Sequence, residues 1–306
     1  MTLHGSDLPS TTPASAIEVF EPAQLTSPVV FASPHSGSYY PSAFVADSCL
    51  ELATLRRSED CYVDELFADA PRFGAPLLRA LYPRAYLDVN REPYELDPEM
   101  FSDPLPRHAN TASARVMAGL GTIARIVSTR REIYRRKLPF AEAEWRIEQV
   151  YRPYHQVLSG LVGRARRKFG FCILVDCHSM PSTGLPVETS ARDGALDFVL
   201  GDRVGLSCSA HVTDAAERIL ADMNYQVVRN NPYAGGYTTQ HYGDPANGIH
   251  VLQIEINRAL YMNEVTLERR VRFAALKADL STFIGKMTVF AAAENRSLQY
   301  TRLSAE

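Results

Sequence analysis

The feature that most constrains the fold of this chain is a series of short apolar runs separated by longer amphipathic stretches. The apolar runs cover residues 28–33, 84–89, 171–175 and 250–257. Runs of this length that lead into polar or turn-forming residues are typical of buried strands. Helical spacing of apolar residues is found over residues 58–70, 140–169, 213–224 and 263–287. Strands that alternate with helices predict an α/β fold with a mixed, mostly parallel central sheet flanked by helices.

Two histidines stand at the ends of predicted strands. His35 follows the first run in the turn-like sequence Pro34-His35-Ser36-Gly37, and His178 follows the third run. Ligand sites in parallel sheets gather beyond the carboxyl ends of strands. Imidazole is the commonest protein ligand of catalytic zinc, and such a site has about three protein ligands and a water. One histidine in this position is more often structural, but two of them predict a metal site.

The third ligand is expected to be a carboxylate. Glu59 and Asp60 open the predicted helix that follows His35. Acidic residues also stabilise a helix N-terminus through the helix dipole, so their position alone has a structural explanation. Because two histidines need an anionic partner, we expect Asp60 to complete the metal site, with Glu59 as the alternative.

A general base is expected in the last predicted strand. Gln253 and Glu255 point to one face of this strand, and the apolar residues between and beside them point to the other. A carboxylate buried in a strand is costly unless it is paired or functional. Glu255 is therefore our candidate base, and an ion pair with Arg258 is the structural alternative.

Several cations and one loop are candidates for substrate binding. Arg84 and Arg91 flank the second apolar run, and Asn90 precedes Arg91. The planar guanidinium group of arginine binds carboxylates through two hydrogen bonds, although each arginine alone is also consistent with an ordinary surface residue. The turn Gly235-Gly236-Tyr237-Thr238 could cover a substrate or simply join two strands.

The composition excludes several classes of partner. The formal net charge is −3, which provides no overall positive field for nucleic acid or an acidic membrane surface. No stretch approaches the ~20 apolar residues of a membrane helix. The five cysteines are odd in number and lack C-x-x-C spacing, which favours a reduced, cytoplasmic compartment. We therefore expect neither a nucleic-acid nor a membrane partner, and the oligomeric state is left open.

The domain organisation is expected to be simple. The first 16 residues are rich in Ser, Thr and Pro, and they lack the basic start and apolar core of a secretory signal. No internal repeat or linker divides the remainder. We predict a disordered tail over residues 1–16 and a single domain over residues 17–306, in which Pro153 kinks or divides the second long helix.

Six sequence blocks together resemble the N-formylglutamate amidohydrolases. They occur in the order found in that family and span most of the chain. The blocks are Ser33-Pro34-His35-Ser36-Gly37, Glu59-Asp60-Cys61-Tyr62-Val63-Asp64, Asp88-Val89-Asn90-Arg91, Asp176-Cys177-His178-Ser179-Met180, Gly235-Gly236-Tyr237-Thr238 and Gln253-Ile254-Glu255-Ile256-Asn257 with Tyr261-Met262. That family is similar in fold to the zinc carboxypeptidases, so the resemblance implies a zinc carboxypeptidase-like domain.

The resemblance also implies a role for each candidate residue. A zinc ion, or another divalent metal that suits such a nitrogen and oxygen site, would be held by His35, Asp60 and His178. Glu255 would act as the base, and Arg84 would stabilise the oxyanion. The residues expected to bind substrate are Asn90, Arg91, Tyr237, Gln253 and Arg258. One departure is the long gap between His35 and the acid, since carboxypeptidases keep the two only a few residues apart.

The activity implied by the resemblance is hydrolysis of N-formyl-L-glutamate to formate and L-glutamate, a late step of histidine degradation. The substrate would be a small molecule that carries a carboxylate. The alternatives are a carboxypeptidase-like exopeptidase, or another N-acyl amino acid hydrolase, that uses the same zinc site. A non-catalytic binding protein with this fold is disfavoured because every candidate ligand and the candidate base are present.

Overall fold

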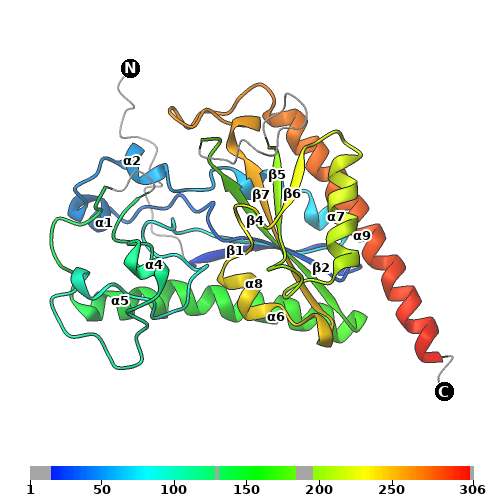
Figure 1. Ribbon diagram of the computed structural model, residues 1–306, viewed down its shortest axis with the longest axis horizontal. Coiled ribbons are helices and arrows are strands. Elements are labelled where there is room, and N and C mark those ends of the chain that lie inside the picture. Colours follow the sequence, from blue (N-terminus) through cyan, green and yellow to red (C-terminus); the bar gives the residue numbers. More distant parts are fainter. Residues whose placement is uncertain (1–14, 128–130, 184–195, 304–306) are drawn as a thin grey trace. The chain divides into compact units, whose positions relative to one another are not determined.

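The computed structural model of the chain describes residues 15–127, 131–183 and 196–303 (Figure 1). The strands are β1 (Ile17–Phe20), β2 (Val29–Ser33), β3 (Leu77–Ala80), β4 (Cys172–Met180), β5 (Phe198–Gly201), β6 (Val227–Arg229) and β7 (Ile249–Asn257). The helices are α1 (Ser42–Asp47), α2 (Leu52–Arg56), α3 (Val63–Leu66), α4 (Ala114–Met117), α5 (Phe140–Arg146), α6 (Arg152–Phe169), α7 (Ala210–Ala221), α8 (Tyr237–Tyr242) and α9 (Phe273–Leu303). Most of the predicted tail, residues 1–14, lies outside the described residues.

The strands form a seven-stranded sheet in the order β1-β3-β2-β4-β7-β5-β6. β2 pairs in parallel with β4, β4 with β7, and β5 with β6, whereas β5 and β7 are antiparallel. β2 and β4 are buried along their whole length, as expected for central strands of a parallel sheet covered on both faces. The predicted α/β fold with a mixed, mostly parallel sheet flanked by helices is confirmed.

Three of the predicted strands are present as β2, β4 and β7. β4 is longer than predicted because it continues to Met180. His178 therefore lies inside a strand, near its carboxyl end, rather than in the loop that follows. Within the described residues, no helix has both the length and the apolar character that crossing a bilayer requires.

The strand predicted over residues 84–89 is wrong. The carbonyl oxygen of Pro83 accepts hydrogen bonds from the backbone N–H groups of Tyr86 at 2.9 Å and Leu87 at 3.2 Å, so the chain turns here. The carbonyl of Tyr86 accepts a hydrogen bond from the Arg146 side chain. Turn and side-chain partners thus satisfy backbone groups that a strand would pair with a neighbour. The strand of this region is β3, which precedes the predicted run.

The long helix predicted over residues 140–169, kinked or divided near Pro153, is confirmed. α5 and α6 are joined by a π-helical segment, Ile147–Tyr151, which ends two residues before the proline. Proline has no backbone N–H, and its ring clashes with the carbonyl four residues earlier in a regular α-helix. The wider π turn accommodates this clash without ending the helix.

Two of the other predicted helices begin later or are shorter than expected. Over residues 58–70 only α3 and the start of a short 3-10 turn, Ala70–Phe73, are helical. Tyr62 has φ 66°, a left-handed conformation that ends any helix before it. α7 agrees with the prediction within a few residues, whereas α9 begins only at Phe273. In the turn that replaces the start of α9, the side-chain oxygen of Asn263 accepts hydrogen bonds from the backbone N–H groups of Val265 and Thr266.

Contacts divide the chain into two compact units, each assembled from three segments. The first unit comprises residues 1–18, 34–61 and 79–157, and the second comprises residues 19–33, 62–78 and 158–306. In the second unit, α3 and α9 pack against β2, and α8 packs against β7. α7 packs against α9 (Figure 1). The single domain expected from residue 17 onward stays a prediction.

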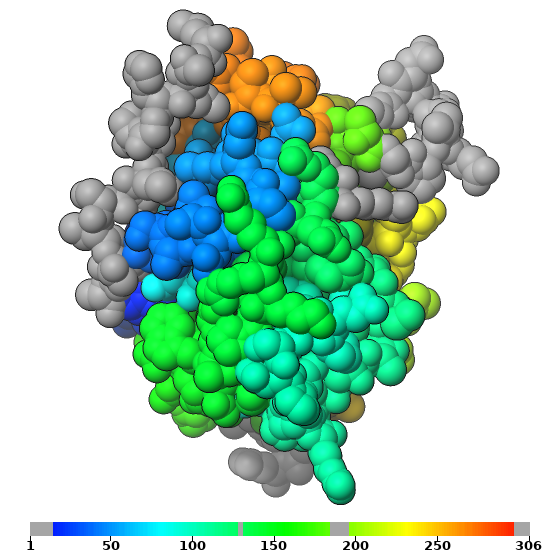
Figure 2. Space-filling view, turned by 90° about the vertical axis from the view of Figure 1, so that its left-hand side faces the viewer, coloured from blue at the N-terminus to red at the C-terminus, as the bar shows by residue number. Residues whose placement is uncertain are grey.

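In the first unit, the chain that follows α1 lies beside a segment more than 80 residues later in the sequence (Figure 2, blue beside green). The backbone N–H of Cys49 donates to the carbonyl of Ile133 at 2.8 Å. An ion pair of 2.5 Å joins Asp47 to Arg136. Because residues so distant in sequence contact each other, this unit depends on tertiary contacts rather than on long regular elements.

Arg146 is the buried cation of the first unit, with a side chain that is 1% exposed. Its Nη1 donates to the carbonyl of Tyr86 at 2.9 Å and to the hydroxyl of Tyr134 at 2.8 Å. Its guanidinium carbon lies 4.0 Å from the centre of the Tyr86 ring and 5.5 Å from that of Phe44, and it forms an ion pair with Glu142. Cation–π contacts and hydrogen bonds thus offset the cost of burying this charge.

We expect Arg146→Met to lower the free energy of unfolding by ~3–5 kcal/mol, because a buried carbonyl, a buried hydroxyl and Glu142 would lose their donor. Arg152→Met is the matched control, since Arg152 forms an exposed ion pair with Glu148 four residues earlier on the same long helix. Its effect should stay below ~1 kcal/mol. Urea unfolding followed by circular dichroism measures both, and equally small losses would contradict the structural role of Arg146.

Candidate metal centre and active site

The three expected metal ligands lie together. His35, Asp60 and His178 each offer one ligand atom, and these atoms all lie within 4.8 Å of one another. All three side chains are buried. His35 Nδ1 and Asp60 Oδ2 are 3.4 Å apart, which matches two atoms that bind one ion at ~2.1 Å in tetrahedral geometry. The group therefore has the composition and spacing of a divalent metal site.

The long sequence gap between His35 and Asp60 is closed by one backbone hydrogen bond. The N–H of Asp60 donates to the carbonyl of His35 at 3.0 Å. His35 is placed by β2, which ends two residues before it at Ser33. The two ligands thus become neighbours through folding, although they are distant in sequence.

The neighbouring acid, Glu59, is held elsewhere. Its Oε1 accepts hydrogen bonds from the hydroxyl of Tyr40 at 2.6 Å and from Arg56 Nε at 3.2 Å. Its Oε2 accepts one from the thiol of Cys61 at 3.2 Å. Burial raises the pKa of Glu59, and the nearby Arg56 opposes this rise. Between the two acids considered from the sequence, Asp60 is the one in the histidine group.

Each histidine of the group has a buried carboxylate beside one ring nitrogen. His35 Nε2 lies 2.6 Å from Asp88 Oδ1, and His178 Nε2 lies 3.0 Å from Asp176 Oδ2. A carboxylate in this position holds one ring nitrogen as a donor and leaves the lone pair of the other for a metal. Two imidazoles and a carboxylate, supported in this way, fit zinc or another divalent metal.

Asp88 also contacts both arginines predicted from the sequence. Its Oδ2 is 2.8 Å from Arg84 Nη2 and 3.5 Å from Arg91 Nη2, and its Oδ1 accepts the backbone N–H of Asn90 at 2.8 Å. Burial would raise the pKa of Asp88, but Arg91, His35 and Arg84 together hold it well below its usual range. One ionised carboxylate therefore connects a candidate metal ligand to Arg84, the predicted oxyanion residue, and to two predicted substrate-binding residues, Asn90 and Arg91.

Arg84 and Arg91 differ in how firmly the protein holds them. Arg91 Nε donates to the carbonyl of Leu120 at 2.9 Å, and its Nη1 donates to that of Asn90 at 2.8 Å. With the Asp88 contact, each of its three nitrogens faces a protein oxygen, and its side chain is 12% exposed. The side chain of Arg84 is 25% exposed. Arg91 is thus the more deeply buried of the two cations.

Glu255 lies on the strand next to that of His178. β4 and β7 pair in parallel with His178 opposite Glu255 and Asp176 opposite Gln253. Opposite residues in a pair of strands project to the same face and are about 4.8 Å apart. The candidate base therefore lies beside a candidate ligand, and Gln253 Nε2 donates to Glu255 Oε1 at 2.8 Å.

The remaining predicted residues occupy the ends of these elements. Arg258 follows β7 and contacts Ser179 of β4, with Nε 3.1 Å from the serine hydroxyl. Tyr237 opens α8, and its hydroxyl lies 3.2 Å from His241 Nδ1. The backbone N–H of Gly236, one residue earlier, donates to Gln253 Oε1 at 2.7 Å. The loop is thus attached to Gln253 on the polar face of β7, and Arg258 contacts the carboxyl end of β4.

Sequence reasoning assigned no role to Asp88 or Asp176. Both lie in sequence blocks next to predicted site residues, Asp88 near Asn90-Arg91 and Asp176 near His178. The available signal was their position, since each is an acid at the polar end of an apolar run that also carries a candidate residue. A supporting carboxylate near a histidine is common in metal sites, so this signal was sufficient to propose them.

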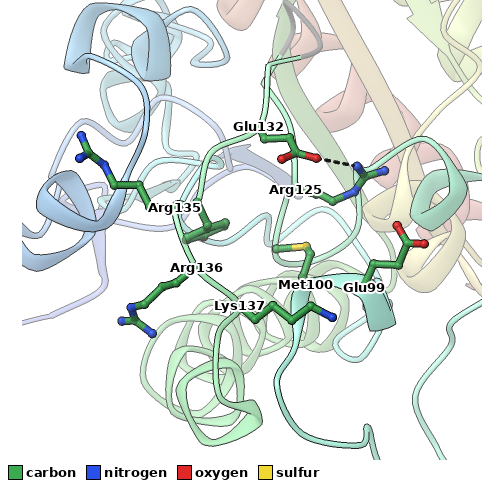
Figure 3. A pocket seen from close by; sticks show the side chains of 8 residues that line it. Glu99, Met100, Arg125, Glu132, Arg135, Arg136 and Lys137 are labelled. Carbon is green, nitrogen blue, oxygen red and sulfur yellow. Dashed lines mark hydrogen bonds and ion pairs between the residues drawn. The ribbon is translucent and has the colours of Figure 1, made fainter.

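A separate pocket in the first unit has a volume of about 290 Å³ and contains none of the predicted residues (Figure 3). Its lining includes Glu99, Met100, Arg125, Glu132, Tyr134, Arg135, Arg136 and Lys137. Arg125 forms ion pairs with Asp97 and Glu132, and Arg136 forms one with Asp47. Much of the positive charge in this pocket is therefore balanced within the protein.

Comparisons with known proteins show the family to which this chain belongs. The family model of N-formylglutamate amidohydrolase matches residues 27–262. The N-formylglutamate deformylase of Pseudomonas putida is 32% identical over 241 residues, which cover 78% of this chain and 82% of that protein; its counterpart from Pseudomonas aeruginosa is 30% identical over 241 residues, covering 78% and 83%. The crystal structure of N-formylglutamate amidohydrolase from Ralstonia eutropha JMP134 superposes with a TM-score of 0.85 at 37% identity, covering 92% of this chain and 99% of that one. The chain belongs to the N-formylglutamate amidohydrolase family.

Proposed function

We propose that this protein hydrolyses N-formyl-L-glutamate to formate and L-glutamate, and that His35, Asp60 and His178 hold the zinc ion, or another divalent metal, that the reaction needs. The observation that carries the proposal is the convergence of these three buried ligands in a chain whose curated relatives are N-formylglutamate deformylases. The supporting carboxylates beside both histidines agree with it.

In the proposed reaction, His35, Asp60 and His178 would hold a metal ion, which would supply a Lewis acid for the formyl oxygen and for the attacking water. Glu255 accepts a proton from the attacking water and passes it to the leaving amine. Its position opposite His178 in the parallel pair of β4 and β7 supports this role. The polar face of these two strands then carries both a ligand and the base.

Two arginines of the first unit, Arg84 and Arg91, are proposed to bind negatively charged groups of the substrate. Arg84, the more exposed of the two, stabilises the negative charge that develops on the formyl oxygen. Arg91, together with Asn90, holds a carboxylate of the substrate, since a guanidinium group binds carboxylates with charge-assisted hydrogen bonds. Tyr237 and Arg258 are the remaining candidates for contact with the substrate.

Metal content and formate release test the proposed function directly. We expect purified protein to contain about one divalent metal ion per chain and to release formate from N-formyl-L-glutamate faster than from N-acetyl-L-glutamate or dipeptides. Asp60→Ala and His178→Ala should each lose both metal and activity. His211→Ala is the control, because His211 is an exposed histidine outside the group. Metal retained in both ligand variants, measured by plasma mass spectrometry, would contradict the assigned site.

The role of Glu255 is tested with Glu255→Gln. We expect kcat to fall by roughly 10²–10⁴-fold, the usual contribution of general acid–base catalysis. Melting temperature and metal content should stay close to wild type, because the amide oxygen of the new side chain still accepts the hydrogen bond from Gln253. Glu144→Gln, on an exposed part of α5, controls for loss of a carboxylate. A folded, metal-loaded Glu255→Gln protein with near-normal kcat would remove Glu255 from the mechanism.

Substitutions of the two arginines should change different steady-state kinetic parameters. Arg84→Met should mainly lower kcat, because it removes a contact made in the transition state, whereas Arg91→Met should mainly raise KM. Arg91→Met should also lower the melting temperature, since the carbonyls of Leu120 and Asn90 lose their donor. Kinetics and melting are therefore measured on the same preparations. Unchanged kcat and KM in both variants would show that neither cation meets the substrate.

A further inference from the structure

Gln253 uses both ends of its side-chain amide to connect two parts of the candidate site. Its Oε1 accepts the backbone N–H of Gly236 at 2.7 Å, and its Nε2 donates to Glu255 Oε1 at 2.8 Å. The side chain is buried within β7, where its neighbours Leu252 and Ile254 are apolar and completely buried. Burying an amide in such a strand costs free energy unless its oxygen and nitrogen form hydrogen bonds. Here both atoms form hydrogen bonds with other groups of the protein.

The chemistry of the two partners fixes the orientation of this amide. The backbone N–H of Gly236 can only donate, so the oxygen of Gln253 must face it. The NH₂ group must then face Glu255, where it requires an acceptor. Rotating the amide by 180° would place donors against the donor of Gly236. Gln253 is therefore held in one orientation, in which it restrains the Glu255 carboxylate.

The approach of the loop to Gln253 depends on a glycine in the neighbouring strand. Gly201 of β5 lies opposite Gln253, and a Cβ atom at Gly201 would lie 2.8 Å from the carbonyl carbon of Ala234 and 2.9 Å from the nitrogen of Gly235. Those distances are too short for any side chain, so only glycine allows the loop to lie directly on the sheet. The loop is further held by a hydrogen bond of 2.8 Å from Arg203 N to the carbonyl of Ala234.

We propose that Gln253 is a positioning residue that aligns Glu255 and makes this alignment depend on the seating of the loop over residues 234–236. The proposal rests on the proposed function, because it takes Glu255 as the base. It replaces the substrate-binding role expected for Gln253 from the sequence. If the loop lifts from β5, Gly236 no longer fixes the amide of Gln253, and the carboxylate of Glu255 loses a restrained donor. The start of α8, with Tyr237, is then linked to the base through the side chain of Gln253.

Two substitutions at Gln253 separate its two hydrogen bonds. Gln253→Met removes both, and we expect kcat to fall about 10–100-fold, as for other supporting residues of active sites, with KM close to wild type. Gln253→Glu keeps an acceptor for Gly236 but replaces the neutral amide donor with a second carboxyl group beside Glu255, so it should lower kcat without releasing the loop. Gln240→Met, at an exposed position of α8, is the control. A raised KM with unchanged kcat would restore the substrate-binding role and overturn the positioning role.

The dependence on the loop is tested with Gly201→Ala, which leaves Gln253 and Glu255 in place. Hydrogen exchange of the peptide over residues 233–240 should accelerate in Gly201→Ala and Gln253→Met but not in Gln253→Glu, and kcat should fall in Gly201→Ala. Gly160→Ala is the matched control, because no atom lies within 4 Å of a Cβ atom added there. Faster exchange with unchanged kcat in Gly201→Ala would overturn the link between loop and base.

Failure of this proposal is distinguishable from failure of the proposed function. A wild-type protein that holds metal but releases no formate contradicts the function itself, and hydrogen exchange still reports whether Gln253 anchors the loop. A wild-type enzyme that is active, and whose kcat and exchange are unchanged in Gln253→Met, contradicts only the positioning role. Melting temperatures of all variants within a few degrees of wild type show that the comparison is made on folded protein.

Discussion

The parallel pairing of β2, β4 and β7 is the constraint on which the candidate site depends. It places Ala32 opposite Asp176, and His178 opposite Glu255. Because side chains alternate along a strand, a slip of one residue would bring an apolar side chain such as Ile254 to the position of Glu255. The apolar residues of the other face are completely buried, so the hydrophobic core that stabilises the sheet also fixes which polar side chains meet.

Charge in the first unit is organised around Asp88. A buried carboxylate is costly unless cations or donors surround it, and here His35, Arg84 and Arg91 supply them. They hold the pKa of Asp88 well below its usual range against the effect of burial. One anion thus restrains a metal ligand and the predicted substrate cations together, so a change at any of these residues is expected to disturb the others.

The sequence was sufficient where burial alone determines structure. The runs that form β2, β4 and β7 are buried on both faces, and their apolar character was visible directly. The run at residues 84–89 was wrongly predicted as a strand because its apolar side chains are buried in turns. Residue types alone do not show which groups the backbone pairs with. For the same reason, the sequence could not show whether Glu59 or Asp60 joins the metal site, because adjacent acids differ mainly in the partners that they meet after folding. Tyr40 and Arg56 form hydrogen bonds with Glu59.

The partners of the two central carboxylates also explain why they suit different roles. Asp88 is surrounded by cationic groups, which stabilise its charged form and make it a poor acceptor of a proton. Glu255 receives from Gln253 a donor that carries no charge, and such a hydrogen bond stabilises an anion less than an arginine does. It therefore restrains the direction of the carboxylate without placing a positive charge of its own beside it. A general base must be held in the direction of the proton that it accepts, and the amide of Gln253 provides that restraint for Glu255.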